Sequence, residues 1–187
     1  METYQGKTRL FFREMAQIVE SNGLSVVVLT DADSQRALTI ICDEPMTQQL
    51  LIRINHLPGE TTMLPEVLTK LLFNDGCTSP RDYELLVYGI DNGQYKTVLT
   101  SLTTDSSVSI RISDAILLST FSDIPLYIDN HLLLLQSSRY TPHTSGLVIP
   151  INTISLEHLE KELQKAVAEE NYRLASSIYD EIKKRKQ

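Results

Sequence analysis

Two amphipathic helical segments follow one another at the C-terminal end of this chain. Their apolar residues recur every three or four positions, at Leu156, Leu159, Leu163, Ala166 and Val167 and then at Tyr172, Ala175, Ile178 and Ile182. This spacing places each set on one face of a helix. The polar residues Glu170 and Asn171 separate the two sets. We therefore predict an antiparallel helical hairpin over residues 154–187.

This segment resembles the UVR motif, the short helical hairpin of bacterial nucleotide-excision-repair proteins. The core of the motif is F-E-x-A-A-x-L-R-D-x-I. The residues of this chain that correspond to it are Tyr172, Ala175, Ser176, Ile178, Asp180 and Ile182. Arg173 and Tyr179 depart from it. In repair proteins the motif contacts other proteins, so the resemblance implies a protein partner bound through Ser155–Lys186. The alternative is an ordinary amphipathic hairpin that packs on its own domain or on a second copy.

The charge of the chain is unevenly distributed. Residues 1–150 contain 10 Lys and Arg against 17 Asp and Glu, which accounts for the whole net charge of −7, and residues 151–187 contain 7 of each. Binding to phosphate draws on clustered cations, and the acidic body has no such stripe. The basic run Lys183–Lys186 lies where a helix C-terminus favours cations, and a nucleic-acid patch is the alternative for it.

The two cysteines and the apolar runs bear on the compartment. Cys42 and Cys77 form no CxxC pair and have no histidine at zinc-ligand spacing, so we expect thiols in a reducing compartment. The first ten residues, METYQGKTRL, contain no apolar core of the kind that a signal peptide has, and no apolar run in the sequence reaches membrane-spanning length. We therefore expect a cytoplasmic protein that does not bind membranes.

In the body of the chain, predicted strands follow one another in runs, and predicted helices do the same. β-branched or alternating runs predict strands over residues 24–30, 36–42, 83–90, 94–100, 107–112 and 125–128. Helices are predicted to begin near Asp43, Pro65, Ser113 and Asn130. Residues 10–19 fit either a strand or a helix. The sequence Asp91-Asn92-Gly93 predicts a tight hairpin turn, and turns at residues 21–23 and 31–34 fit a three-stranded meander.

These elements predict an α+β fold, with a mostly antiparallel sheet and helices packed on it. The predicted division is a domain over residues 1–136, a linker over 137–153 that is rich in Ser, Thr, Pro and Gly, and the hairpin over 154–187. We expect a symmetric homo-oligomer, because the domain is small and the apolar stripe of the hairpin needs cover.

The body resembles the bifunctional nuclease family, bacterial and plant domains credited with DNase and RNase activity. Arg36, Leu38 and Ile40 match the family pattern R-x-L-P-I-x-I-G, and Asn92-Gly93 corresponds to the D-G turn of the family. Its most recognisable stretch, R-P-S-D-A-I-A-L-A ending in P-I-F, corresponds to residues 111–119 and then to Ile124–Tyr127. The resemblance runs from about residue 21 to residue 128. It implies a divalent-metal nuclease acting on DNA or RNA.

The resemblance also implies a set of site residues. Glu66 and Asp114 would be catalytic and would hold Mg²⁺ or Mn²⁺, and Arg111 would be catalytic and, with Arg36, would bind nucleic-acid phosphate. Each has a structural alternative. A carboxylate in a first helical turn stabilises that helix, which applies to both acids. Arg111 can pair with Asp114 or another carboxylate, and Arg36 can lie in solvent.

Two substitutions support a competing hypothesis. Pro65 occupies the position at which the family has a histidine, and Met46 lies near the position of the glutamate with which the family begins a helix. Neither side chain can hold Mg²⁺ or Mn²⁺ or transfer a proton. A non-catalytic interaction module that keeps the fold and acts through the hairpin is therefore the alternative to a nuclease.

Overall fold

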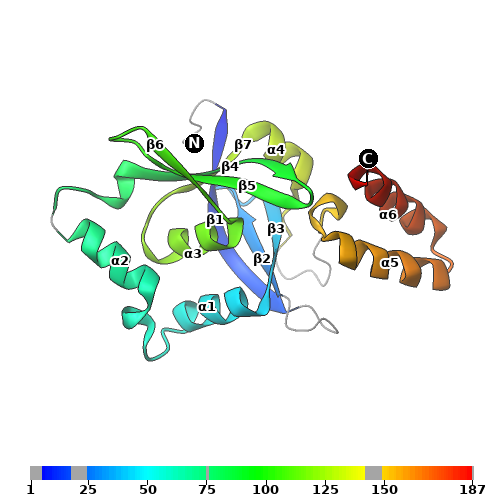
Figure 1. The fold of residues 1–187 in the computed structure, drawn as a ribbon, viewed down its shortest axis with the longest axis horizontal. Coiled ribbons are helices and arrows are strands. Elements are labelled where there is room, and N and C mark those ends of the chain that lie inside the picture. Colours follow the sequence, from blue (N-terminus) through cyan, green and yellow to red (C-terminus); the bar gives the residue numbers. More distant parts are fainter. Residues whose placement is uncertain (1–5, 18–24, 75, 142–148, 187) are drawn as a thin grey trace.

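The computed structural model describes residues 6–17, 25–74, 76–141 and 149–186. Eight strands in these residues form one sheet with the order β6-β5-β4-β7-β1-β2-β3-β8 (Figure 1). The strands are β1 (Lys7–Gln17), β2 (Ser25–Thr30), β3 (Arg36–Cys42), β4 (Tyr83–Asp91), β5 (Gln94–Ser101), β6 (Ser106–Ile110), β7 (Leu126–Asp129) and β8 (Ser138–Arg139). β4 and β7 run parallel, and the other pairings among the described strands are antiparallel. The predicted fold class is confirmed.

Strand β1 connects the two halves of the sheet. It pairs with β2 along one edge and with β7 along the other, so that Lys7 lies opposite Asp129. The segment that fitted either a strand or a helix is thus a strand as far as Gln17, and the predicted turn at residues 21–23 lies outside the described residues. β1, β2 and β3 form the predicted meander. Every residue of β2 is buried, which explains its continuous apolar run.

The helices of the body begin close to the predicted residues. The six α-helices of the described chain are α1 (Glu44–Ile54), α2 (Leu64–Phe73), α3 (Ile112–Phe121), α4 (Asn130–Gln136), α5 (Leu156–Ala168) and α6 (Tyr172–Arg185). The Asp43 side chain accepts a hydrogen bond of 3.0 Å from the backbone N–H of Met46, which caps α1. Helix α3 begins at Ile112 with Arg111 as its N-cap, so the predicted cap Ser113 lies inside the first turn. No helix among the described residues has both the length and the apolar character that crossing a bilayer requires.

The core lies between the sheet and helices α1 and α3. Leu50 of α1 and Ile116 of α3 are fully buried and belong to the same apolar cluster as Leu38, Leu85 and Ile128 of the sheet. Burying one such side chain contributes about 1.5–3 kcal/mol. This cluster positions the N-terminal ends of α1 and α3, where two of the predicted site residues lie.

Tyr95 is a polar exception in this core. Its side chain is buried, its hydroxyl has no hydrogen-bond partner among the described residues, and burial raises the pKa of the phenol above its ordinary value. An unsatisfied buried hydroxyl costs about 1–3 kcal/mol.

We therefore expect Tyr95→Phe to increase the free energy of unfolding by about 1 kcal/mol, measured by urea denaturation. Tyr88→Phe, at a half-exposed tyrosine of the same strand pair, should change nothing. A loss of stability in Tyr95→Phe would contradict the assignment.

Helices α5 and α6 form the predicted antiparallel hairpin at one end of the molecule (Figure 1). Asn171 caps α6 by accepting a hydrogen bond from the Leu174 N–H, and Glu170 before it has a positive φ of 56°. Leu159 of α5 packs with Ile178 and Ile182 of α6 in a cluster of its own. Of the predicted linker, residues 138–139 pair with β3 as β8 and residues 151–153 form a 3₁₀ turn.

The last turn of α6 anchors the hairpin. The Arg185 guanidinium donates to the carbonyl oxygen of Ile154 at 2.6 Å and lies against Gly93 in the β4–β5 turn. A Cβ added at Gly93 would lie 2.6 Å from Nη1 of Arg185 and 3.1 Å from the Ile154 oxygen. This turn therefore requires glycine both for its φ of 81° and for the close approach.

A pair of glycine substitutions separates these two requirements. We expect Gly93→Ala to lower the free energy of unfolding by more than the roughly 1–2 kcal/mol that left-handed backbone costs a residue with a Cβ. Gly59 has a similar φ of 95°, and no atom lies within 4 Å of the place that a Cβ would occupy there, so Gly59→Ala should show the backbone cost alone. Urea denaturation of both variants measures the difference. Equal losses would show that the contact with Arg185 contributes nothing.

Candidate functional site

Arg111 and Asp114 form an ion pair at the start of α3. Arg111 Nε donates to Asp114 Oδ2 at 2.7 Å, and Nη2 donates to Oδ1 at 3.0 Å. The Arg111 side chain is 71% exposed. The pKa of Arg111 is raised by its hydrogen bonds to Asp114, by the charge of that carboxylate, and then by the charge of Asp43. Asp43, which caps α1, thus contributes to the shift at Arg111, and α1 and α3 pack against each other.

Glu66 pairs with a different arginine. Its Oε1 accepts from Arg53 Nε at 2.5 Å, and its Oε2 accepts from Arg53 Nη2 at 2.7 Å. Both side chains are buried, at 3% and 8% exposure for Arg53 and Glu66. Arg53 Nη1 donates to the backbone and side-chain oxygens of Gln49, and the guanidinium carbon lies 5.3 Å from the centre of the Phe121 ring. The pair links α1 to α2 in the interior.

The two acids lie at different ends of α3. Asp114 is in the first turn of this helix, whereas Arg53, which holds Glu66, lies against Phe121, the last residue of α3. Phe121 lies seven positions after Asp114, which corresponds to about 10 Å of helix rise. The structure therefore brings Arg111 together with Asp114 but does not bring Glu66 to them.

The donor set does not fit a divalent cation. Mg²⁺ and Mn²⁺ are held by several oxygens, carboxylates foremost among them, and both predicted acids already accept two hydrogen bonds from an arginine. In the parts of the chain that the structure describes, no group of three or more His, Cys, Asp or Glu side chains is placed to hold a metal ion.

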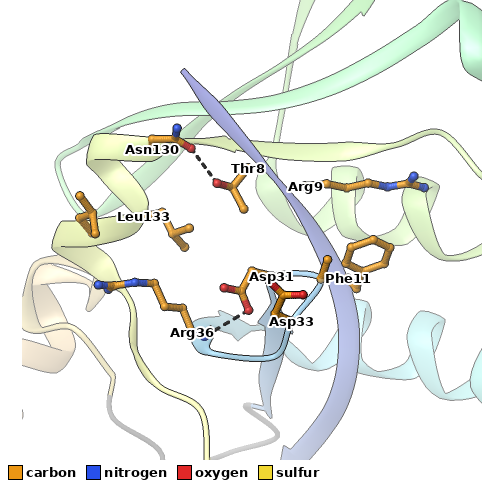
Figure 2. A pocket seen from close by; sticks show the side chains of 10 residues that line it. Thr8, Arg9, Phe11, Asp31, Asp33, Arg36, Asn130 and Leu133 are labelled. Carbon is orange, nitrogen blue, oxygen red and sulfur yellow. Dashed lines mark hydrogen bonds between the residues drawn. The ribbon is translucent and has the colours of Figure 1, made fainter. Parts of the chain in front are cut away.

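Arg36 lies elsewhere, at the edge of a pocket of about 550 Å³ between β1, the β2–β3 turn and α4 (Figure 2). Its guanidinium donates to Ser137 Oγ at 3.1 Å, and its backbone N–H donates to Asp31 Oδ1 at 3.2 Å. Arg36 begins β3 and Asp43 follows its last residue, so the pocket is about 20 Å of strand away from the start of α1. The pocket wall carries charges of both signs, with Arg9 and Asp33 beside Arg36 and Asp31.

The positions that the family resemblance marks for a histidine and a glutamate have structural roles here. Pro65 is in the first turn of α2, where its missing N–H costs nothing. Met46 is buried in the core beside Leu50. Cys42, the last residue of β3, is also buried, and burial followed by the charge of Asp43 raises the pKa of its thiol to about 12. None of the three offers a base or a nucleophile at neutral pH.

Arg53 is the residue that sequence patterns did not single out. It follows Met46 and Leu50 at helical spacing, so it occupies a position on the buried stripe of α1. A buried arginine requires a paired carboxylate. That rule indicates a partner acid, but nothing in the spacing identifies Glu66, which follows a loop and belongs to another helix.

One protein-family model matches the body of this chain. The model of the bifunctional nuclease domain matches residues 27–140, which is more than half of the chain and includes Arg36, Glu66, Arg111 and Asp114. The match ends before α5, so the helix pair lies outside it. No curated protein sequence is similar enough to this chain to count as a match.

Proposed function

This chain belongs to the bifunctional nuclease domain family, and we propose that it acts as a non-catalytic member that binds another protein through helices α5 and α6. The observation that carries the proposal is the state of the two candidate acids. Asp114 and Glu66 are each bound by two hydrogen bonds to an arginine, at separate places. A metal-dependent phosphodiesterase needs carboxylates that share one ion.

The outer surface of the helix pair supports a protein partner. Tyr172 and Tyr179 of α6 are 68% and 57% exposed, and their spacing of seven residues places them on the same side of the helix. Val167 at the end of α5 is also exposed. Exposed tyrosines are enriched at protein interfaces, where they contribute much of the binding energy. The resemblance of this segment to the UVR motif, a protein contact element, supports the same proposal.

The alternative is phosphodiester hydrolysis of DNA or RNA at the Arg111–Asp114 pair. One local observation favours it. The exposed Arg111 is the N-cap residue of α3, and helix N-termini attract phosphate. Hydrolysis ranks second because Pro65 and Met46 occupy the positions that the resemblance marks for a histidine and a glutamate.

Affinity capture tests the proposal. The full chain is compared with a Tyr172→Ala/Tyr179→Ala variant and with Tyr88→Ala, a control at a tyrosine of similar exposure on β4. We expect the full chain and the control to retain one specific protein from an extract of the source cells and the α6 variant to lose it, because the removed rings supply the contact area. Binding of the purified partner to the three proteins, measured by calorimetry, then quantifies the loss. Equal binding to all three would contradict the proposal.

A further inference from the structure

Helix α2 has its apolar face outside and its charge inside. Glu66, its one fully buried residue, is held in the interior by Arg53. Its large aliphatic side chains face solvent instead, with exposures of 69% for Leu64, 38% for Val67, 49% for Leu68, 70% for Leu71 and 54% for Leu72. We call these five residues the α2 surface. Figure 1 shows α2 at the end of the molecule opposite to α5 and α6.

An exposed surface of this kind is costly in water. Five aliphatic side chains, on average about half exposed, present on the order of 500 Å², near the upper end of the 300–600 Å² that typical monomers leave uncovered. Single exposed leucines need no explanation, but a continuous helical stripe does. We infer that the α2 surface is a two-fold interface with a second copy of this chain.

The spacing of the stripe favours a second copy. Leu68 lies in the middle, with Leu64 one turn before it and Leu71 and Leu72 one turn after it. When two such helices pack antiparallel about an axis near Leu68, Leu64 of each copy meets Leu71 and Leu72 of the other. The stripe is therefore self-complementary, as a two-fold interface requires.

Charge and area agree with this assignment. The chain is strongly acidic overall, at −7, so two copies repel each other over most of their surface. Within α2 the single acid, Glu66, is buried and paired, and the single exposed charge is Lys70. Two copies can therefore approach here without bringing carboxylates together. The two surfaces bury on the order of 1,000 Å², the lower limit for a specific interface, so the dimer should dissociate on dilution.

Sedimentation equilibrium of the full chain tests the interface. The mass should rise with concentration from 21.2 kDa towards twice that value. Leu71→Glu should remain a monomer throughout the series, because it places two buried carboxylates in the interface. Leu135→Glu is the matched control, since Leu135 is 64% exposed on α4, and it should dimerise as the wild type does. Circular dichroism verifies that both variants are folded.

A cross-linking variant gives an independent result. In a Cys77→Ser background, Leu68→Cys should be joined into dimers by a short bis-maleimide, because the two Leu68 positions face each other near the axis, whereas Leu135→Cys should not. A wild type that stays monomeric at every concentration would overturn the inference. So would a dimer that persists in Leu71→Glu, or one that Leu68→Cys does not cross-link.

Discussion

Replacing Glu66 by leucine should lower the free energy of unfolding by about 3–5 kcal/mol, the cost of leaving a buried charge without its partner. Arg53 cannot turn to water, because α1 is fixed in the core through Met46 and Leu50. Its guanidinium would retain Gln49 and Phe121 but no counter-charge. Urea denaturation measures the loss. The same substitution at Glu157, in a surface pair with Lys161 whose side chains are 75% and 65% exposed, should cost far less, because solvent screens an exposed pair.

The double variant Arg53→Met/Glu66→Leu tests the cause of that loss. It separates the cost of leaving Arg53 buried without a counter-charge from the cost of removing the ion pair as a whole. Apolar residues of similar volume can replace a buried ion pair with little loss. We therefore expect the double variant to recover most of the stability lost in Glu66→Leu. A double variant as unstable as the single one would show that the loss has another cause, such as poor packing of leucine at this position.

Replacing Leu159 by alanine should unfold the helix pair while leaving the body folded. Leu159 is completely buried, and removing such a side chain costs about 2–5 kcal/mol. Among the described residues this cluster is small, with Ile178 and Ile182 as its other buried members, so the loss is a large share of what the cluster contributes. Because the helix pair is a separate cluster, it can open on its own, as local units of proteins do.

Hydrogen exchange locates that effect. Amides of α5 and α6 should lose their protection in Leu159→Ala, whereas those of β2 and β3 should keep theirs. Val167→Ala is the control on the same helix, because Val167 is 52% exposed and alanine is the better helix former. Uniform loss of protection over the whole chain would show that the helix pair and the body unfold together.

Features that depend on neighbours in sequence were predictable. The turn Asp91-Asn92-Gly93 predicts the β4–β5 hairpin, and Asp43 predicts the start of α1, because each forms its hydrogen bonds within a few residues. The pairing of Arg111 with Asp114 belongs to the same class, since three residues along a helix start bring the two side chains together. The break at Glu170-Asn171 likewise predicts the C-terminal hairpin.

Features that depend on distant contacts were not predictable. No local pattern places β1 in the middle of the sheet, where Lys7 lies opposite Asp129. The apolar residues of α2 recur at helical spacing, and such a stripe is usually buried, but here the structure turns it to solvent. The reason is the pairing of Arg53 with Glu66, which holds the opposite face of α2 towards the core.

A nuclease assay tests the central claim most directly. Purified wild type, Asp114→Asn and Arg111→Ala are incubated with plasmid DNA and with total RNA, in the presence of Mg²⁺ or Mn²⁺. Because the acids are bound by arginines at separate places, we expect no cleavage by the wild type beyond that of the two variants. Cleavage by the wild type that Asp114→Asn abolishes would contradict the account and establish this family member as a nuclease.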